Sequence, residues 1–582
     1  MNFANINHCW GSLIIEELSR LGVDYFCVAP GSRSSPLVIA LAQNKKLKSF
    51  VHYDERGLAF HAMGYSASTK KPAVLISTSG TAAADFFPAV IEASKKKLPL
   101  IVVTADRPPE LRQTGAAQTI DQVGLFGKYT QWATDMPCPD ANIAPQFVLT
   151  TIDQAVYQAV RHRGVVHINC MFRQPLTMVK TSGDLKIYTK PLGRWARSHE
   201  PYTDYVAGFE SAAVPSLKRV GTRLDAIKRG LIVVGKISGT NEAQLVLQLS
   251  EKLGWPIFAD ISSGLRLGQN HSHLIHYFDH LLLSDKLQNK LYFDGVLHLG
   301  GRMTSVRYYD LIHKQKPLEY IMVLDHALRN DPNHQVTLRI ESSVGNFIKT
   351  VIGLIKQRKQ SSALKVLSKA NQITDKLIEK YIFEDGRLSE PCVARMVSQL
   401  IPEDQGLFLS NSMPIRDMSN YADFKASRVC VNGNRGASGI DGIIASAAGY
   451  ASGLQKPVTL MIGDLAALHD LNSLGMLRGL SVPLIIVLLN NGGGGIFSFL
   501  PIADFKEGFE KFWGTPHSFS LAGAAAMFEL NYSQPMDAVH FKKVYMQALK
   551  SQTSTIIEII TSREENLKVH RLMEDVIKES MN

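Results

Sequence analysis

The stretch 458–500 constrains the fold of this chain most strongly, because its pattern indicates a strand, a tight turn, a helix, a second strand and a glycine-rich loop. An apolar run at 458–462 ends at a Gly-Asp pair, apolar residues recur at helical spacing over 465–478, and 482–489 is continuously apolar. This order predicts a right-handed βαβ unit of a buried parallel sheet. Both turns then lie at the carboxyl ends of neighbouring strands, where open α/β sheets bind their ligands.

These two turns carry oxygen atoms that suit Mg²⁺. The first turn offers the carboxylate of Asp464, and the second offers Asn490, Asn491 and four successive glycines. Carboxylate, amide and backbone carbonyl oxygens are hard ligands for Mg²⁺, which commonly completes its octahedron with phosphate and water. Glycines also let the backbone approach a diphosphate, to which loop amides can donate.

The spacing of the two turns narrows the choice of ligand. The separation of Asp464 and Asn491 resembles the thiamine diphosphate signature, in which a Gly-Asp-Gly turn is followed by an Asn-Asn pair. Leu465 stands where most thiamine enzymes have the second glycine of that turn. Either turn alone is also explained by an aspartate that caps a helix or by a polar turn that ends a strand. The two turns together, at this spacing, favour a thiamine diphosphate site over these local explanations.

The length of the chain, 582 residues, is too great for a single core. Repeated strand-turn-helix order predicts an α/β protein built of doubly wound parallel sheets. We expect three such domains of the thiamine diphosphate-dependent enzyme type, at 1–188, 189–362 and 363–582. The composition of 185–201 is typical of a linker between the first two.

Charge and cysteine content limit the partners and the compartment. The net charge of +11 comes from scattered groups, and it is explained either by a solvated basic surface or by anionic ligands. Basic and aromatic residues do not interleave as they do in nucleic-acid sites, so we expect no nucleic-acid partner.

Six widely spaced cysteines predict reduced thiols in a cytoplasmic protein. Without a signal sequence or an apolar run of roughly 20 residues, we expect no membrane insertion.

Glu55 is the candidate catalytic residue. It follows a predicted strand at 50–53 and stands near the start of a helix. Most such glutamates are first-turn carboxylates that the helix dipole favours. With thiamine bound, however, a glutamate that bonds one ring nitrogen of the aminopyrimidine would favour the imino tautomer, which could remove the thiazolium proton. The predicted diphosphate site favours this second role.

Arginines form a second group of candidate residues, because the guanidinium fork matches a carboxylate in bidentate geometry. A single surface arginine is usually only solvated, but four of the five candidates follow predicted strands, which favours their convergence on a polyanionic substrate. The five are Arg33, Arg107, Arg307, Arg416 and Arg435. Ser32 and Gln118 would add neutral hydrogen bonds.

Seven motifs, in this order, resemble one enzyme family. They are APGSRS (29–34), DERG (54–57), TSGTA (78–82), TADRPPEL (104–111), NRGASGIDG (434–442), GDLAALHDLN (463–472) and NNGGGGIF (490–497). Together they resemble the 2-succinyl-5-enolpyruvyl-6-hydroxy-3-cyclohexene-1-carboxylate (SEPHCHC) synthases, the thiamine diphosphate-dependent enzymes of menaquinone biosynthesis. The likeness covers both outer domains nearly throughout and is weak in the middle one.

The resemblance implies a reaction and an assembly. In this family the ylide of the cofactor attacks 2-oxoglutarate, CO₂ leaves, and the succinyl-type carbanion adds in 1,4 fashion to isochorismate. The first domain would bind the pyrimidine and the third the diphosphate, with the cofactor between the first domain of one subunit and the third of another. A homodimer would be the smallest active unit, and a homotetramer is common among relatives.

Matching motifs assign roles to individual residues. Glu55 would activate the cofactor, and Asp464, Asn491 and the Gly493 carbonyl would hold Mg²⁺, which Mn²⁺ can replace. Ile440 would support the bent form of thiamine. The cofactor-binding residues would be Asn411, Ser412, Ile440, Gly463, Asp464, Leu465, Ala466, Asn491, Gly493, Gly494 and Ile496. The substrate-binding residues would be Ser32, Arg33, Arg107, Gln118, Arg307, Arg416, Arg435, Phe497 and Leu500, with Ile496 also lining the cavity.

Two departures from the family pattern concern the site. Val306 stands where the family often has a lysine, and Gly492 stands where the loop often has a third asparagine. Two alternatives remain. One is another thiamine-dependent 2-oxoacid decarboxylase or carboligase, and the other is a non-catalytic nucleotide or nucleic-acid binder that the charge of +11 would suit.

Overall fold

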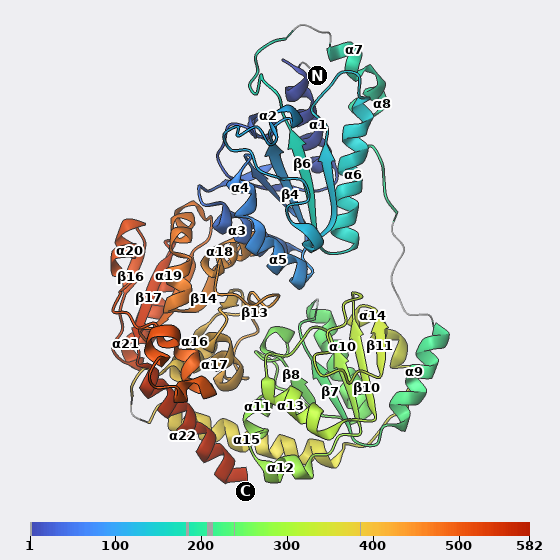
Figure 1. The fold of residues 1–582 in the computed structure, drawn as a ribbon. Coiled ribbons are helices and arrows are strands. Elements are labelled where there is room, and N and C mark those ends of the chain that lie inside the picture. Colours follow the sequence, from blue (N-terminus) through green and yellow to red (C-terminus); the bar gives the residue numbers. More distant parts are fainter. Residues whose placement is uncertain (1–2, 182–184, 207–213, 238, 385, 582) are drawn as a thin grey trace.

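The computed structural model describes residues 3–181, 185–206, 214–237, 239–384 and 386–581. These residues form three β-sheets with helices packed on them (Figure 1). Every strand pair within the sheets is parallel. The expected α/β class, with three parallel sheets, is therefore confirmed.

The order of the strands across each sheet differs from their order in the chain. The first sheet is β2 (Lys48–Val51), β1 (Tyr25–Val28), β3 (Ala73–Ser77), β4 (Leu100–Asp106), β6 (Val165–Met171) and β5 (Thr130–Met136). The middle sheet is β11 (Leu338–Glu341), β10 (Glu319–Leu324), β9 (Gly295–Leu299), β7 (Gly230–Val234) and β8 (Ile257–Ala259). The third sheet is β13 (Cys430–Asn432), β12 (Gly406–Leu409), β14 (Val458–Gly463), β15 (Leu484–Asn490), β17 (Thr555–Ile560) and β16 (Asn531–Ser533).

The helices follow the same three-part division. The first part has α1 (Ile6–Arg20), α2 (Ser35–Gln43), α3 (Glu55–Thr69), α4 (Thr81–Ala84), α5 (Phe87–Lys96), α6 (Pro145–Arg161), α7 (Leu185–Thr189) and α8 (Gly193–Ala196). The middle has α9 (Val214–Ala226), α10 (Thr240–Leu253), α11 (Phe278–Leu281), α12 (Asp285–Lys290), α13 (Val306–Gln315), α14 (Val344–Val351) and α15 (Ser362–Ile382). The last has α16 (Glu390–Leu400), α17 (Met413–Tyr421), α18 (Ile443–Leu454), α19 (Asp464–His469), α20 (Ala522–Met527), α21 (Ala538–Ala548) and α22 (Arg563–Met581). Among the described helices, none has the length and apolar character that crossing a membrane requires.

The first and third sheets share one strand order, counted from the start of each domain. In both, the second strand lies outside the first, and the third strand lies on the opposite side of the first. The loops after the first and third strands therefore diverge, which creates the crevice where such sheets bind ligands. In the third sheet this crevice lies between β12 and β14, next to Asn411, Ser412 and Asp464.

One hydrophobic core joins the first and third domains, because α3 packs directly on α18. Glycines allow the two helix backbones to come close. A Cβ on Gly64 would lie 2.1 Å from the Ser446 carbonyl oxygen, and a Cβ on Gly449 would lie 1.9 Å from the His61 carbonyl oxygen. The start of α3, where Glu55 lies, is thereby fixed against the third domain of the same chain.

We expect Gly64→Ala to lower the thermal midpoint of unfolding, because the added methyl group has no space at this crossing. Overpacking of this kind typically costs about 1–3 kcal/mol. Gly523→Ala on α20 is the matched control, since no atom lies within 4 Å of its added Cβ and alanine exceeds glycine in helix propensity by about 1 kcal/mol. Equal midpoints for the two variants in calorimetry would contradict the close packing of α3 on α18.

The single helix predicted over 465–478 was wrong. Instead α19 ends early, and a 3₁₀ helix, η5 (Leu471–Gly479), follows it. Asp470, between them, is 1% exposed, and its carboxylate accepts hydrogen bonds from the Ala445 backbone N–H (3.0 Å) and the Ser473 hydroxyl (2.6 Å). These bonds tie the chain to the start of α18 and redirect it, which helical spacing of apolar residues does not reveal.

The segment 185–201 is not the free linker that its composition indicated. It contains α7 and α8, and Trp195 is 3% exposed within the core of the first domain. The indole of Trp195 donates to the carboxylate of Glu17, and the guanidinium carbon of Arg20 lies 3.9 Å from the centre of the indole ring. Leu192 and Trp195 in the core, with Leu185 and Tyr188 packed against it, dock a stretch that is otherwise polar and rich in turn-forming residues.

Candidate active site

The turns after β14 and β15 meet, as the sequence predicted. The Gly493 N–H donates to Oδ2 of Asp464 at 2.9 Å, and the Leu465 N–H donates to Oδ1 at 2.6 Å. Asp464 is 2% exposed, and burial raises the pKa of its carboxyl group. A carboxylate held in this way keeps free lone pairs on both oxygens, so it can still bind a cation.

Asn491 contributes the second oxygen. Its Nδ2 donates to Oε1 of Glu390 at 2.8 Å, while its Oδ1 is buried and has no hydrogen-bond partner among the described residues. A buried polar atom without a partner is unfavourable unless something else occupies the space in front of it. Gly493 has φ 148°, and a Cβ there would lie 2.2 Å from the Gly514 carbonyl oxygen, so only glycine fits. This oxygen set suits Mg²⁺.

His517 belongs to the same place, although no sequence motif indicated it. Its Nε2 lies 3.3 Å from Oδ2 of Asp464, and its backbone N–H donates to the Gly492 carbonyl at 3.2 Å. No local pattern marks His517, because it lies in an irregular segment after the glycine-rich loop. Among the described residues no three His, Cys, Asp or Glu side chains gather as a metal cluster, so an ion here would depend on amide and backbone oxygens as well.

The residues predicted to border the diphosphate also lie close together. The amide of Asn411 donates to two carbonyls of the loop 434–439 (2.8 and 2.6 Å) and accepts from Nη1 of Arg435 at 2.8 Å. Ser412 has φ 65°, a left-handed conformation that is unusual for serine and typical of functional sites. The guanidinium of Arg416 donates to the Ser412 carbonyl. Two predicted cofactor residues and two predicted substrate residues therefore form one cluster.

A second cluster lies at the carboxyl ends of β1 and β4, where Ser32, Arg33, Arg107 and Gln118 were predicted to bind substrate. Arg33 is 6% exposed and donates to the Phe172 carbonyl at 2.7 Å, but its Nε is buried without a partner among the described residues. Arg107 donates to Oε1 of Gln118 at 3.4 Å. Burial, and secondarily the charge of Arg107, lower the pKa of Arg33. Two neighbouring cations with an unused N–H favour an anionic ligand.

Arg307 comes from the middle domain and lies near the cluster that holds Arg416. Its guanidinium pairs with Asp279 and with Glu574, each at 2.5 Å. Asp279 is also a charged neighbour of Arg416, so Arg307 lies at the edge of the Arg416 cluster. The charge of Arg307 is already balanced by two carboxylates, and its role toward substrate stays a prediction.

Glu55 is the first residue of α3, as expected for a residue between a strand and a helix. Burial raises the pKa of its carboxyl, with further contributions from Asp85 and Asp54. Asp54 accepts from Nδ2 of Asn472 at 3.1 Å, and Arg56 donates to the backbone of the α19–η5 segment. The end of α3 that carries Glu55 therefore contacts, in the same chain, the segment that begins at Asp464.

Apolar predicted residues lie at the surface of this region. Ile440 is 36% and Leu500 46% exposed, and Ile496 and Phe497 are partly buried in the short helix η6 (Gly495–Phe499). Ala466 is 5% exposed, and the Gly494 N–H donates to the Gly514 carbonyl at 2.8 Å. Exposed apolar side chains beside buried polar ones are typical of a ligand site.

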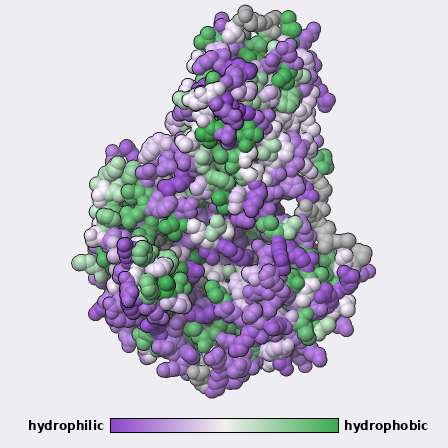
Figure 2. Space-filling view, in the orientation of Figure 1, coloured by the Kyte–Doolittle hydropathy of each residue, from purple (hydrophilic) through white to green (hydrophobic). Residues whose placement is uncertain are grey.

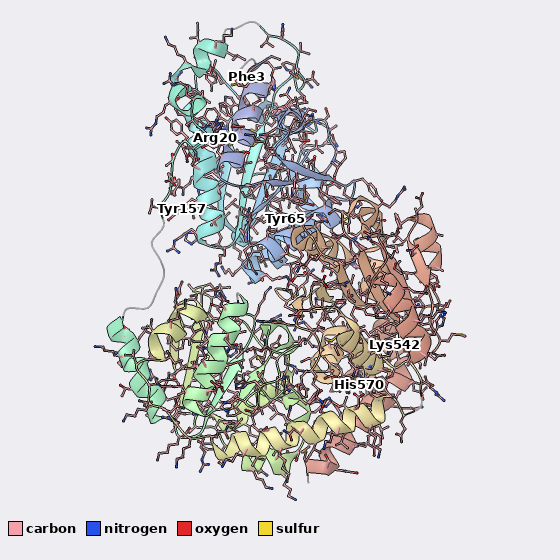
Figure 3. The ribbon with its side chains drawn as sticks, turned by 180° about the vertical axis from the view of Figure 1, so that it is seen from behind. Phe3, Arg20, Tyr65, Tyr157, Lys542 and His570 are labelled. Atoms are coloured by element: carbon pink, nitrogen blue, oxygen red, sulfur yellow. The ribbon has the colours of Figure 1, made fainter. Side chains whose placement is uncertain are left out.

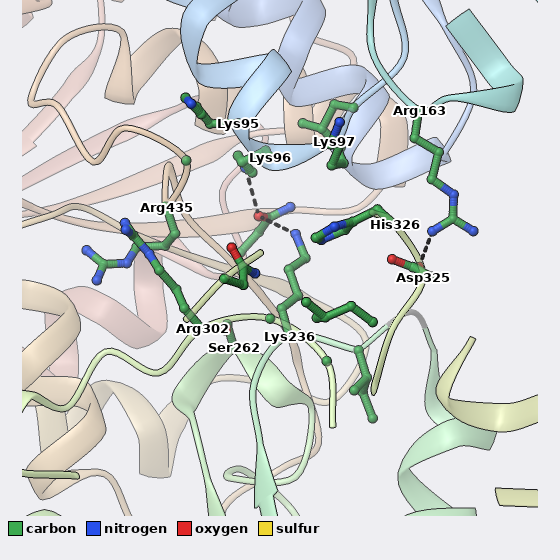
Figure 4. A pocket seen from close by; sticks show the side chains of 18 of the residues that line it. Lys95, Lys96, Lys97, Arg163, Lys236, Ser262, Arg302, Asp325, His326 and Arg435 are labelled. Carbon is green, nitrogen blue, oxygen red and sulfur yellow. Dashed lines mark hydrogen bonds and ion pairs between the residues drawn. The ribbon is translucent and has the colours of Figure 1, made fainter. Parts of the chain in front are cut away.

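A cavity of about 830 Å³ lies where the three domains meet, and Figure 4 shows its basic lining. Lys96 donates to the Gly433 carbonyl at 2.8 Å, and burial lowers the pKa of Lys96 to about 8. Arg302 from the middle domain donates to the hydroxyl of Ser438 at 2.7 Å, close to Arg435. Arg435 is the one residue of the predicted site that lines this cavity within the described chain. The side chains of Lys96 and Arg302, which no motif indicated, add positive charge around Arg435.

Two family models match parts of this chain. Residues 10–125 match the model described as thiamine pyrophosphate enzyme, N-terminal TPP binding domain, and residues 186–409 match the model described as middle domain of thiamine pyrophosphate. Thiamine pyrophosphate is another name for thiamine diphosphate. With these two matches and its three parallel sheets, the chain is a thiamine pyrophosphate enzyme.

Curated relatives identify the family within this class. A protein of Rubrobacter xylanophilus is 44% identical over 97% of this chain and 97% of its own, and one of Chlorobium phaeobacteroides is 43% identical over 98% of each. One of Prosthecochloris aestuarii is 42% identical over 98% of this chain and 97% of its own. All three bear the name 2-succinyl-5-enolpyruvyl-6-hydroxy-3-cyclohexene-1-carboxylate synthase. The chain belongs to this synthase family and is a transferase of that class.

Proposed function

We propose that this chain is a thiamine diphosphate- and Mg²⁺-dependent carboligase of menaquinone biosynthesis. It decarboxylates 2-oxoglutarate and adds the succinyl-type carbanion to isochorismate, giving SEPHCHC and CO₂. The observation that carries the proposal is the meeting of Asp464, Gly493 and the Asn491 oxygen, which has no partner among the described residues, at the carboxyl ends of β14 and β15. Membership in the synthase family supplies the choice of reaction.

The metal and the diphosphate would be held by the third domain. Asp464, Asn491 and the Gly493 carbonyl would bind Mg²⁺ or Mn²⁺, and the Asn411 and Ser412 loop with Gly463, Leu465, Ala466 and Gly494 would border the diphosphate. When bound, the thiamine thiazolium supplies the electron sink for decarboxylation and carbon–carbon bond formation. Ile440 would support the bent cofactor, and Ile496, Phe497 and Leu500 would line the substrate cavity and exclude water.

Glu55 would hold a proton at one nitrogen of the pyrimidine ring. The half-buried start of α3 supports this role, because burial raises the pKa of the Glu55 carboxyl group. A protonated carboxyl group can donate a hydrogen bond to a ring nitrogen, whereas a carboxylate can only accept one.

The substrates would be bound through their carboxylates. Arg33 and Arg107, with Ser32 and Gln118, offer one cationic group, and Arg416 and Arg435 offer another, with Arg307 nearby. The basic cavity beside Arg435 supports an anionic substrate, since its positive field raises the local concentration of anions.

The active assembly would be a homodimer or homotetramer with its sites at the subunit interface, located in the cytoplasm. Exposed apolar side chains support contact between copies. They gather on the third domain around α20 (Figure 2) and include Phe519 (63%), Met527 (77%), Met536 (85%) and Val539 (83%). Patches of this kind often mark association surfaces. The domain limits 1–188, 189–362 and 363–582 are part of this proposal, with α8 packing back on the first domain and α15 leading from the middle domain into the third.

Purified protein tests the function directly. With thiamine diphosphate, Mg²⁺, 2-oxoglutarate and isochorismate, we expect CO₂ release to depend on both substrates and SEPHCHC to form. Conversion of pyruvate without use of isochorismate would favour a different thiamine-dependent decarboxylase or carboligase. Binding of nucleic acid with a steep salt dependence, unchanged by Glu55→Gln, would favour the non-catalytic alternative.

A further inference from the structure

Two neighbouring asparagines lie at the end of β15, and each is held by a buried glutamate. Nδ2 of Asn490 donates to Oε1 of Glu558 at 2.7 Å, and Nδ2 of Asn491 donates to Oε1 of Glu390 at 2.8 Å. Glu558 is 0% and Glu390 1% exposed. Glu558 lies on β17 and Glu390 starts α16, so the two amides are held from different elements.

The two amides differ at their oxygen ends. Oδ1 of Asn490 accepts from the Gly492 N–H at 3.2 Å, so both ends of this side chain are used within the protein. Oδ1 of Asn491 is buried and has no such partner among the described residues. Asn490 therefore completes the turn, whereas Asn491 presents an oxygen with unused lone pairs to the space beside Asp464.

We propose that Glu390 is a positioning residue: by accepting from Nδ2 of Asn491, it fixes the amide with its oxygen toward the metal ion. The inference rests on the proposed function, because it requires Mg²⁺ between Asp464 and Asn491. A side-chain amide has a donor end and an acceptor end of nearly the same shape. Without an acceptor behind it, the Asn491 amide can rotate by half a turn, and its NH₂ group would then repel the cation.

The surroundings of Glu390 argue against a purely structural role. The side chain of Ser389 caps α16 by accepting from the Cys392 N–H at 3.2 Å, so Glu390 is not needed as the cap. Asp417, a second buried carboxylate, faces it as a like charge. Burying two carboxylates together is unfavourable, because both charges lose their hydration and repel each other.

Other contacts hold the carboxylate of Glu390 in place. The hydroxyl of Thr561 donates to the same Oε1 at 3.3 Å. On the other side, Nε2 of His570 lies 3.0 Å from Oδ1 of Asp417, and Nδ1 of His570 lies 3.0 Å from the Tyr421 hydroxyl. His570 belongs to α22 (Figure 3), so the C-terminal helix places a histidine beside Asp417. The Asn491 amide is thus held by a carboxylate that the Thr561 hydroxyl also contacts.

The test is Glu390→Met in the full-length protein, which removes the acceptor but keeps the volume. With saturating thiamine diphosphate, free Mn²⁺ is measured by electron paramagnetic resonance, so the readout does not require turnover. We expect Mn²⁺ to bind about 10- to 100-fold more weakly, the usual effect of losing a partner that orients a metal ligand. Circular dichroism and thermal midpoints check the fold.

Glu558→Met is the matched control, because it removes the acceptor behind the other asparagine. Glu558 also accepts from Ser520 and Tyr532 (2.7 and 2.6 Å), so this variant is expected to melt at lower temperature. Its Mn²⁺ affinity should nevertheless stay close to that of the unmodified protein. An equal loss of affinity in both variants would overturn the inference, because general damage to the turn would then explain it.

A double-mutant cycle separates action through Asn491 from any other route. In an Asn491→Ala background, Glu390→Met is expected to cause no further loss of Mn²⁺ affinity. A loss of the same size with and without Asn491 would overturn the inference. If Glu390→Met does not fold, Glu390→Asp replaces it, since its carboxylate keeps the charge but is set back by one methylene group. Unchanged affinity in that variant would also overturn the inference.

The same titration distinguishes failure of this inference from failure of the proposed function. If the unmodified protein with thiamine diphosphate binds no Mn²⁺, or if Asp464→Asn leaves the binding unchanged, the metal site itself is wrong and this inference falls with it. If the unmodified protein binds Mn²⁺, Asp464→Asn weakens it and Glu390→Met does not, only the role of Glu390 is refuted.

Discussion

Glu55→Gln is expected to lower kcat by about 10²- to 10⁴-fold, the usual contribution of a positioned acid–base group, while the protein keeps its fold and its cofactor. Glutamine has the same shape but cannot pass a proton to the pyrimidine ring. Steady-state rates of CO₂ release from 2-oxoglutarate with isochorismate measure the loss. Calorimetric titration with thiamine diphosphate and Mg²⁺ checks that binding is retained.

Glu564→Gln is the matched control for this result, because Glu564 is also a first-turn glutamate, on α22, and is exposed. If Glu55 were only a first-turn carboxylate, both substitutions would change stability by about 0.3–1 kcal/mol and neither would change the rate. A rate for Glu55→Gln within a few-fold of the unmodified enzyme would refute the catalytic assignment.

The sequence predicted best where the local pattern and the fold agree. The runs 458–462 and 482–489 are apolar because both strands are buried on two faces, and the chain must leave each strand at the same edge of a parallel sheet. Contact between the turns of Asp464 and Gly493 follows from this topology alone. For the same reason the glutamate of α3 and the arginines after β1 and β4 could be assigned to sheet edges from the sequence.

Strands that carry buried polar residues were harder to predict. β6 carries His167 and Asn169 within a fully buried run, and β17 carries Glu558 among isoleucines. Asn169 and Glu558 both have partners far away in the sequence: Asn169 bonds to Asp106 at 2.9 Å, and Glu558 bonds to Asn490. Periodicity describes one segment at a time, so it gives no account of a polar group that is stabilised from elsewhere.

Sequence reasoning missed, for the same physical reason, the side chains that contact the predicted site residues from other parts of the chain. Glu390 starts a helix 101 residues before Asn491, and His517 reaches Asp464 from an irregular loop. Arg302 comes from the middle domain, where the motifs are weak. These side chains act by touching predicted residues, and only the folded chain brings them within hydrogen-bonding distance.

Asp464→Asn is expected to abolish the stabilisation of the protein by thiamine diphosphate and Mg²⁺. The asparagine keeps an oxygen for the Leu465 N–H but loses the charge that attracts the cation. A ligand that no longer binds the folded protein no longer raises its free energy of unfolding. At a ligand concentration 100 times Kd, the unmodified protein should gain about 2.7 kcal/mol. The thermal midpoint with and without both ligands measures this gain, which should be absent in the variant.

Asp470→Asn is the control. Asp470 is also a buried aspartate, six residues after Asp464, and its carboxylate bonds to groups of its own domain. Burial raises the pKa of Asp470 to about 6, and its carboxylate links η5 to the start of α18. The substitution is expected to lower the midpoint of the ligand-free protein and to leave the ligand-induced shift intact. A full shift in Asp464→Asn would instead exclude this carboxylate as a metal ligand, because removing a charge that would hold Mg²⁺ must weaken the binding of the ion and of the cofactor that depends on it.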